Sequence, residues 1–268
     1  MDDIVDELPL GREVRVEPGL FAERRCFLAT TARALFAAGF LPNRTYAALA
    51  AGDHLSFDEF LAEVLPAAQR LVGDTSTSGQ DTYLKVLGEH AVKLTDVTAP
   101  PWNDSAQSLG PGTFIGVNRG PNGAATDPFV ALHWRMEPGT RIEAHAHTHG
   151  NVCTLGLEGE VMVTNFEMQG ARDFDVATPF IARRTITQLL GRGDVNLVSL
   201  DRNYVHGTIA GPEGGRGLDI TTRIKPRRPG VPYLRLERRV EGSTELFNAV
   251  WTDLAGMKTQ DPALLATH

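Results

Sequence analysis

The stretch Arg141-Ile-Glu-Ala-His-Ala-His-Thr-His149 places a histidine at every second position, and His206 follows further along the chain in Asn203-Tyr-Val-His206. Successive side chains of a β-strand point to opposite faces, so His145 and His147 would share one face, roughly 6.5–7 Å apart. Two imidazoles at that spacing can lean onto one ion, and His206 can complete the set. The pattern therefore favours a three-histidine metal site over a merely polar strand face.

The region around these histidines has the pattern of a small antiparallel barrel or sandwich. About eight short apolar runs, separated by glycine-containing turns, fall within roughly 115 residues. Gly211-Pro-Glu-Gly-Gly215 is expected to form a loop. The predicted strands are Thr113–Val117, Phe129–Met136, Ile142–His147, Val152–Leu157, Val161–Phe166, Ile186–Leu190, Asn196–Leu200 and Leu218–Ile224.

Helical periodicity dominates the chain before this region. Ser56 and Glu59 form a capping-box signature, and apolar residues follow at spacings of three and four until Pro66, which we expect to interrupt the helix. A second amphipathic pattern runs from Tyr83 to Leu94. We therefore expect a helical region over residues 1–100, a β-barrel over residues 101–240 and a C-terminal extension over residues 241–268.

The composition indicates a folded protein that acts on small molecules. The 268 residues are 42% hydrophobic and carry a formal net charge of −7, so a core is available but no basic surface for nucleic acid is expected. There is no apolar run of about 18 residues to cross a membrane. Two cysteines, Cys26 and Cys153, are too few for a disulfide framework and fit a reducing compartment. We expect no nucleic-acid or membrane partner, and a homodimer stays open.

One segment offers an alternative to a cytoplasmic location. Arg24-Arg-Cys-Phe-Leu28 resembles a twin-arginine export signal, in which the arginine pair precedes an apolar stretch. Arg33 interrupts that stretch, and the start Met1-Asp-Asp-Ile-Val-Asp-Glu7 is acidic where such signals are basic. An ordinary helix explains the same residues, so the cytoplasm is the expected location.

Around the histidine pair the chain resembles the first cupin motif, through Gly139-x5-His145-x-His147 and Leu157-Glu-Gly-Glu-Val-Met-Val163. His206 stands where the second motif has its single histidine. The second motif departs from the family pattern at Asp201, Asn203 and Ala210. The resemblance covers about residues 110–235 and implies a mainly β fold, the cupin double-stranded β-helix barrel, here with an N-terminal α-helical segment.

The absence of a carboxylate ligand narrows the resemblance to cupins that hold their metal with three histidines. Cupins with four protein ligands carry a glutamate four or five residues after the second histidine, where this chain has Asn151 and Val152. The remaining three-histidine set resembles that of the thiol dioxygenases. The segment from Phe129 to Cys153 is similar to cysteine dioxygenase, and the segment from Val205 to Glu237 is similar to the aminothiol and N-terminal-cysteine dioxygenases.

This resemblance implies a mononuclear non-haem iron enzyme. Fe(II) held by His145, His147 and His206 would bind a small thiol and O2, and both oxygen atoms would pass to sulfur to give a sulfinate. A divalent ion lowers the pKa of a thiol bound to it, so no separate strong base is needed. Zinc, nickel and manganese stay open as alternative metals.

Three arginines are the candidates for holding the substrate. Arg119, Arg135 and Arg223 are expected near the mouth of the barrel. Cysteine dioxygenases have an arginine that grips the substrate carboxylate, but Ile115 and Gly116 lie near that position here. Because arginine grips a carboxylate by a bidentate fork with narrow geometry, we expect free cysteine to be a poor substrate.

Three further residues are candidates for catalysis. His149 shares the face of His147 but lies about 13 Å along an ideal strand from His145, so an orienting role, direct ligation and exposure to solvent all stay open, the first being preferred. Tyr204 could donate a hydrogen bond to a bound oxygen or pack at the barrel mouth. Cys153 corresponds, one residue out of register, to the cysteine that is crosslinked to a tyrosine in animal cysteine dioxygenase, but no such crosslink is expected here.

Two other polar residues of the predicted strands also have expected roles. His133 is expected to be structural, and Asp219 is expected to bond either a ligating histidine or Arg223.

Two other classes of function stay open. A three-histidine cupin can also cleave carbon–carbon bonds with O2, or isomerise a substrate with the metal as a Lewis acid. Certain anti-sigma factors join a helical segment to a zinc-binding cupin, so a non-catalytic zinc regulator is the third class.

Overall fold

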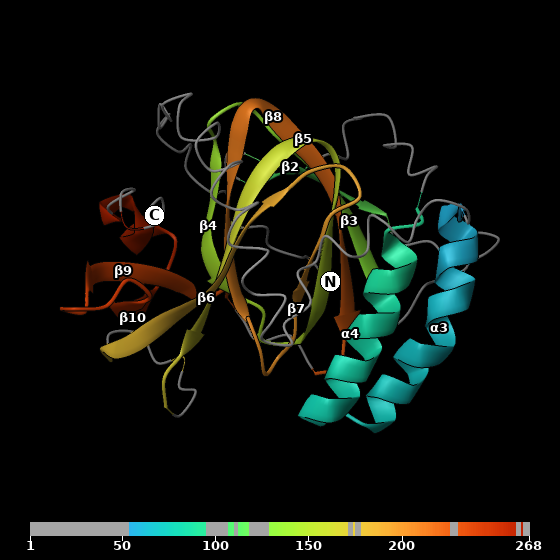
Figure 1. Cartoon of the computed structure of the whole chain (residues 1–268), viewed down its shortest axis with the longest axis horizontal. Helices are drawn as coiled ribbons and strands as arrows, with labels where there is room; N and C mark the ends of the chain where they lie inside the picture. The colour runs from blue at the N-terminus through green and yellow to red at the C-terminus, as the bar shows by residue number, and fades with distance from the viewer. Residues whose placement is uncertain are drawn as a thin grey trace, which may run out of the picture.

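The computed structural model describes residues 54–94, 107–109, 112–117, 129–170, 174, 178–225, 230–260 and 264. Within these residues two helices, α3 (Phe57–Gly73) and α4 (Thr77–Ala91), lie side by side against one flank of a ten-stranded sheet (Figure 1). The strands are β1 (Gln107–Leu109), β2 (Gly112–Val117), β3 (Phe129–Met136), β4 (Arg141–Ala146), β5 (Gly150–Met168), β6 (Phe180–Leu190), β7 (Val195–Val198), β8 (Val205–Arg223), β9 (Tyr233–Arg239) and β10 (Leu246–Thr252), and a short 3-10 helix, η3 (Ala255–Thr259), follows.

Helix α3 begins at the capping box that the sequence predicts. The Ser56 hydroxyl accepts from the Glu59 amide at 3.2 Å, and the Glu59 carboxylate accepts from the Ser56 amide at 2.8 Å. The expectation that Pro66 ends the helix is wrong, because α3 continues to Gly73. Val64 and Leu71, on either side of Pro66, are both buried among α4 and the sheet. This packing holds the helix together in spite of the lost backbone hydrogen bond.

The long strands β5 and β8 form the centre of the sheet. They pair in antiparallel fashion from Gly150 opposite Arg223 to Phe166 opposite Val205, with two register shifts near Gly159. The expectation of a loop over residues 211–215 is wrong, because β8 runs through them. Gly159 and Gly214 have positive φ angles of 66° and 75°, so glycine lets both strands bend at this point while the sheet continues.

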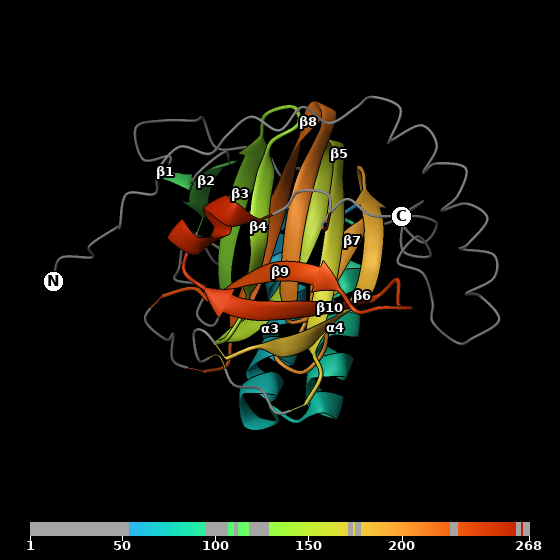
Figure 2. The same ribbon diagram turned by 90° about the vertical axis from the view of Figure 1, so that its left-hand side faces the viewer.

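The remaining strands extend the sheet on both sides of this pair. β8 pairs with β3 and β4, and β5 pairs with β6 and β7. β9 contacts β4 where Tyr233 lies opposite His145, and β10 joins β9 to β6. In Figure 2, β9 and β10 cross in front of the long strands, at the side of the molecule away from the helices.

Three apolar clusters hold these layers together. One lies between the helices and one face of the sheet, and it includes Leu87 and Cys153. A second, with Phe247 and Trp251, packs β9 and β10 onto the other strands. A third includes Trp134 and Ala210 and is contributed by β3, β5, β6 and β8. The expected mainly β fold, an antiparallel sheet preceded by helices, is confirmed. No helix of the described residues is long and apolar enough to span a membrane.

The packing of α4 on the sheet gives a first prediction. Leu87 is fully buried in the cluster between helix and sheet, so Leu87→Ala should lower the free energy of unfolding by about 2–5 kcal/mol through lost burial and the cavity that it leaves. The control Val72→Ala changes a side chain that is 57% exposed, and it should change stability by less than about 0.5 kcal/mol. Urea denaturation of the two variants measures the difference, and equal values would contradict the assigned interface.

Candidate metal centre

Strand pairing brings together the three histidines that the sequence selects. His145 lies in β4, His147 directly follows that strand, and His206 is the second residue of β8. His145 and His206 are direct cross-strand partners, and a register shift between Ile142 and His145 marks a β-bulge just before the site. A bulge re-aims the side chains that follow it. His206 therefore faces His145 although the two residues are far apart in the sequence.

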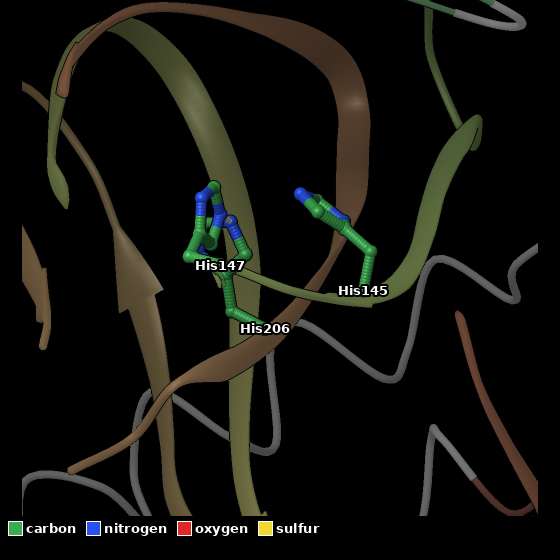
Figure 3. Close-up of side chains that lie close together, drawn as sticks. All are labelled: His145, His147 and His206. Carbon is green, nitrogen blue, oxygen red and sulfur yellow. Dashed lines mark hydrogen bonds between the residues drawn. The ribbon is translucent and has the colours of Figure 1, made fainter. Parts of the chain in front are cut away.

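The three rings converge on one point. One ligand atom from each of His145, His147 and His206 can be chosen so that all lie within 4.8 Å of one another. The Nε2 atoms of His147 and His206 are 2.9 Å apart, and Figure 3 shows His145 pointing at this pair from the side. With metal–nitrogen bonds of about 2.1 Å, two ligands at a right angle would be about 3.0 Å apart. The observed spacing fits neighbouring ligand positions of one ion.

A backbone contact fixes which nitrogen of His145 faces the site. Its Nδ1 lies 2.9 Å from the Glu143 carbonyl oxygen, so Nδ1 carries the proton and donates it there. Nε2 is then the nitrogen with a lone pair for a metal ion. A ligating histidine typically has this arrangement, because the outer hydrogen bond sets both the tautomer and the orientation of the ring.

Burial keeps the imidazoles in the neutral form that binds metals. Desolvation lowers the pKa of His145. Desolvation, reinforced by repulsion from the neighbouring imidazoles, places the pKa values of His147 and His206 well below the ordinary histidine value. Near neutral pH the cluster is therefore uncharged and ready for a cation without first losing protons. The donor set, its spacing and its protonation state all fit a divalent transition metal.

The three residues proposed for catalysis lie in different surroundings. His149 is half-buried and close enough to His147 to lower its pKa, but it is not part of the converging cluster. Tyr204 is buried in the apolar cluster beneath β9 and β10, where its hydroxyl accepts from the Met168 amide at 2.6 Å. Cys153 is fully buried between the helices and the sheet, and desolvation followed by the charge of Asp219 raises the pKa of its thiol. Their catalytic roles stay predictions.

Of the arginines proposed for substrate binding, the two that the structure describes have exposed side chains. Arg135 has a side chain that is 56% exposed, and its nearest ionic partner is Glu137 at 3.4 Å. Arg223 is exposed at the end of β8. Arg119 lies outside the described residues. A role for Arg135 or Arg223 in holding a substrate stays a prediction without support from their positions.

The two buried polar residues of β3 and β8 have other partners than expected. The Asp219 carboxylate accepts a hydrogen bond from the Trp134 indole at 3.1 Å. The expectation that Asp219 bonds a ligating histidine or Arg223 is therefore wrong. Desolvation raises the pKa of Asp219 to about 6. His133 is only 3% exposed, and burial together with the charge of Arg216 lowers its pKa to about 4.

Sequence reasoning missed the neighbours of His145 on its other side. The ring of Tyr233 lies 6.2 Å from the ring of His145, and the two residues face each other across β4 and β9. Burial, followed by the charge of Glu143, raises the pKa of Tyr233. Glu143 pairs with Arg141 at 2.7 Å, and both side chains are largely buried. No motif or spacing in the sequence links residue 233 to the histidines, so only the strand pairing shows the contact.

No family model matches the chain, and no curated protein matches it significantly. Among solved structures, KdgF from Halomonas sp. is similar, with 17% identity over 46% of this chain and 87% of that chain and a TM-score of 0.31. An oxalate decarboxylase from Bacillus subtilis is 18% identical over 44% of this chain and 27% of that chain, with a TM-score of 0.34. The Schizosaccharomyces pombe Cnp3 cupin domain is 16% identical over 47% of this chain and 72% of that chain, with a TM-score of 0.33.

The geometry of the cluster predicts that His206 is required for metal binding. His206→Ala should lower Zn(II) or Fe(II) affinity by more than about a hundredfold, because loss of a direct ligand exceeds the 10- to 100-fold typical of an outer partner. Metal analysis and chelator competition on the purified protein measure this. The control is His90→Ala on α4, where the imidazole contacts only the Val86 carbonyl among the contacts described for it. Equal metal content in both variants would contradict the site.

The pKa of His133 predicts how stability changes with pH. This histidine has a pKa of about 4 in the folded protein and about 6.5 when unfolded, so in between the unfolded chain binds more protons. Stability therefore rises with pH across this window and is lost as the pH falls from 6.5 towards 4. His133→Leu should reduce the slope of unfolding free energy against pH by up to about 1.4 kcal/mol per pH unit. Urea titrations at several pH values test this, and identical slopes would exclude the assignment.

Proposed function

We propose that this protein is a three-histidine, metal-dependent enzyme that uses Fe(II) and O2 to oxidise a small thiol to a sulfinate. The observation that carries the proposal is the convergence on one point of three neutral imidazoles, of which His206 is buried and His145 and His147 are half-buried. Fe(II) bound there would supply both Lewis acidity and the electrons that O2 chemistry requires. The overall change, a thiol plus O2 giving a sulfinic acid, places both oxygen atoms on sulfur and needs no other reductant.

The charge of the site supports an anionic substrate group. Within the described residues the cluster contains imidazoles only, with no carboxylate among its members. Neutral donors leave the charge of a divalent ion uncompensated, which favours an anionic partner such as a thiolate.

Tyr233 is the residue best placed to orient such a substrate. Its ring faces His145 from β9, and its hydroxyl is protonated near neutral pH, since burial raises further a pKa that is ordinarily about 10. A protonated phenol donates a hydrogen bond, so it would hold a polar atom of the substrate in a fixed position. The Glu143–Arg141 ion pair lies on the neighbouring strand and leaves no isolated charge beside this position.

The positions of Arg135 and Arg223 favour a thiol without a carboxylate. Arg135 and Arg223 are exposed, and Arg135 already has Glu137 as its partner. A bidentate grip on a carboxylate requires an arginine fixed close to the metal position. A neutral or aminated thiol is therefore the proposed substrate class, with cysteamine as its simplest representative.

Oxygen uptake with exchanged metals tests this function. Protein loaded with Fe(II) should consume O2 in the presence of cysteamine and produce the sulfinate, whereas Zn(II)-loaded protein should not, because zinc has no accessible redox change. Cysteine should give a kcat/KM at least about tenfold lower than cysteamine, which corresponds to about 1.4 kcal/mol of lost transition-state binding.

The His206→Ala variant, treated with the same Fe(II), is the control for free iron in solution. Turnover of a substrate at equal rates with Zn(II) and Fe(II) would overturn the oxygen-dependent proposal and support Lewis-acid chemistry instead. Tight Zn(II) binding without any turnover of thiols would support a regulatory zinc protein.

A further inference from the structure

We propose that helix α4 positions two of the three histidines, and that Gln80 is the residue through which it acts. The connection runs through the β7–β8 loop, residues 199–204, which lies between Val198 and the start of β8 at Val205. The inference deepens the proposed function and rests on it, because it assigns a role to the helical layer at the same metal centre.

Gln80 joins the helix to this loop by a complete set of hydrogen bonds. Its side chain is only 1% exposed. Its Oε1 accepts from the Leu200 amide at 2.9 Å, and the same amide has a longer second contact with Asn151 Oδ1 at 3.3 Å. The Gln80 Nε2 donates to the Thr75 carbonyl at 2.9 Å and to the Asp201 carboxylate at 2.8 Å. The Thr77 hydroxyl donates to the same Asp201 oxygen at 2.8 Å. Removing this buried amide would take one hydrogen bond from each of its three partners and weaken the link between α4 and the loop.

The loop itself is held in one shape by hydrogen bonds of its own. The Ser199 hydroxyl accepts from the amides of Asp201 and Arg202 at 3.1 and 2.8 Å. Asn203 has a positive φ of 55°, and its amide donates to Glu167 at 2.9 Å. Its carbonyl accepts from the Asn165 amide group at 3.3 Å. A displacement at Leu200 would therefore be passed along the loop instead of being absorbed within it.

The far end of the loop contacts the histidines directly. The Tyr204 carbonyl accepts from the His147 amide at 2.9 Å. The next two residues, Val205 and His206, pair with Ala146 and His145. The loop thus sets the backbone of His147 on one side and continues into His206 on the other. Because the Nε2 atoms of these two histidines are only 2.9 Å apart, a small shift of the loop would change the spacing of the donors.

A different contact of the same helix separates this role from simple attachment of α4 to the sheet. The Tyr83 hydroxyl hydrogen-bonds the Thr222 hydroxyl, near the opposite end of β8 from His206. Tyr83 is buried in the same interface as Gln80 and lies one turn away on the helix. Tyr83→Phe should therefore weaken the attachment of α4 while leaving the hydrogen bonds between Gln80 and the β7–β8 loop in place.

Zn(II) affinity of the full chain, measured by competition with a chromophoric chelator, tests the inference without depending on turnover. Gln80→Leu should lower the affinity by about 10- to 100-fold, the range typical of residues that orient metal ligands. Asp201→Ala, a change in a partly exposed loop residue, should lower it in the same direction and serves as the test if Gln80→Leu does not fold. Tyr83→Phe should lower the melting temperature but change the affinity by less than about twofold. The visible absorption of bound Co(II) should shift in the first two variants only.

Wild-type affinity in Asp201→Ala and in folded Gln80→Leu, together with loss of the ion in His206→Ala, would overturn the role of α4 and leave the metal centre intact. An equal loss of affinity in Tyr83→Phe and Gln80→Leu would also overturn it, because any weakening of the helix would then suffice. Wild-type affinity in His206→Ala would instead overturn the proposed function itself.

Discussion

The antiparallel pairing of β4 with β8 is the interaction on which the metal centre depends. It places His145 directly opposite His206, and the bulge that follows Ile142 turns the histidine pair towards this partner. β8 is fixed along its length by β5 and β3, so the position of His206 is set by a long hydrogen-bonded ladder and not by a flexible connection. Two donors on neighbouring strands of a rigid sheet keep their spacing without help from an ion.

Burial gives this arrangement its chemical character. Imidazoles can be desolvated in neutral form at moderate cost, whereas isolated charges cannot. The carboxylate of Glu143, two residues before His145, is compensated by its ion pair with Arg141. A divalent ion would therefore bring a charge that its ligands do not cancel. This is the physical basis for proposing an anionic, oxidisable substrate group.

The helical layer serves the sheet in two ways. It buries one face of β5 and β8, and this burial raises the pKa of the Cys153 thiol, which keeps that thiol in its protonated, unreactive form. It also reaches past that face to the β7–β8 loop through Gln80. The helices are thus joined by hydrogen bonds to the loop that precedes His206, although the described part of the chain contributes no helical residue to the histidine cluster itself.

Local sequence determined the features that depend on short-range periodicity and chemistry. The alternation of His145 and His147 predicts a strand with both on one face, and Ser56 with Glu59 predicts the start of α3. Only the tertiary structure decided that α3 passes Pro66, that β8 runs through residues 211–215, and that Tyr233 faces His145. The physical reason is the same in each case. Packing of a helix on its neighbours, hydrogen bonding of a glycine-rich segment to a distant strand, and register between β4 and β9 depend on residues far apart in the sequence, which no local pattern contains.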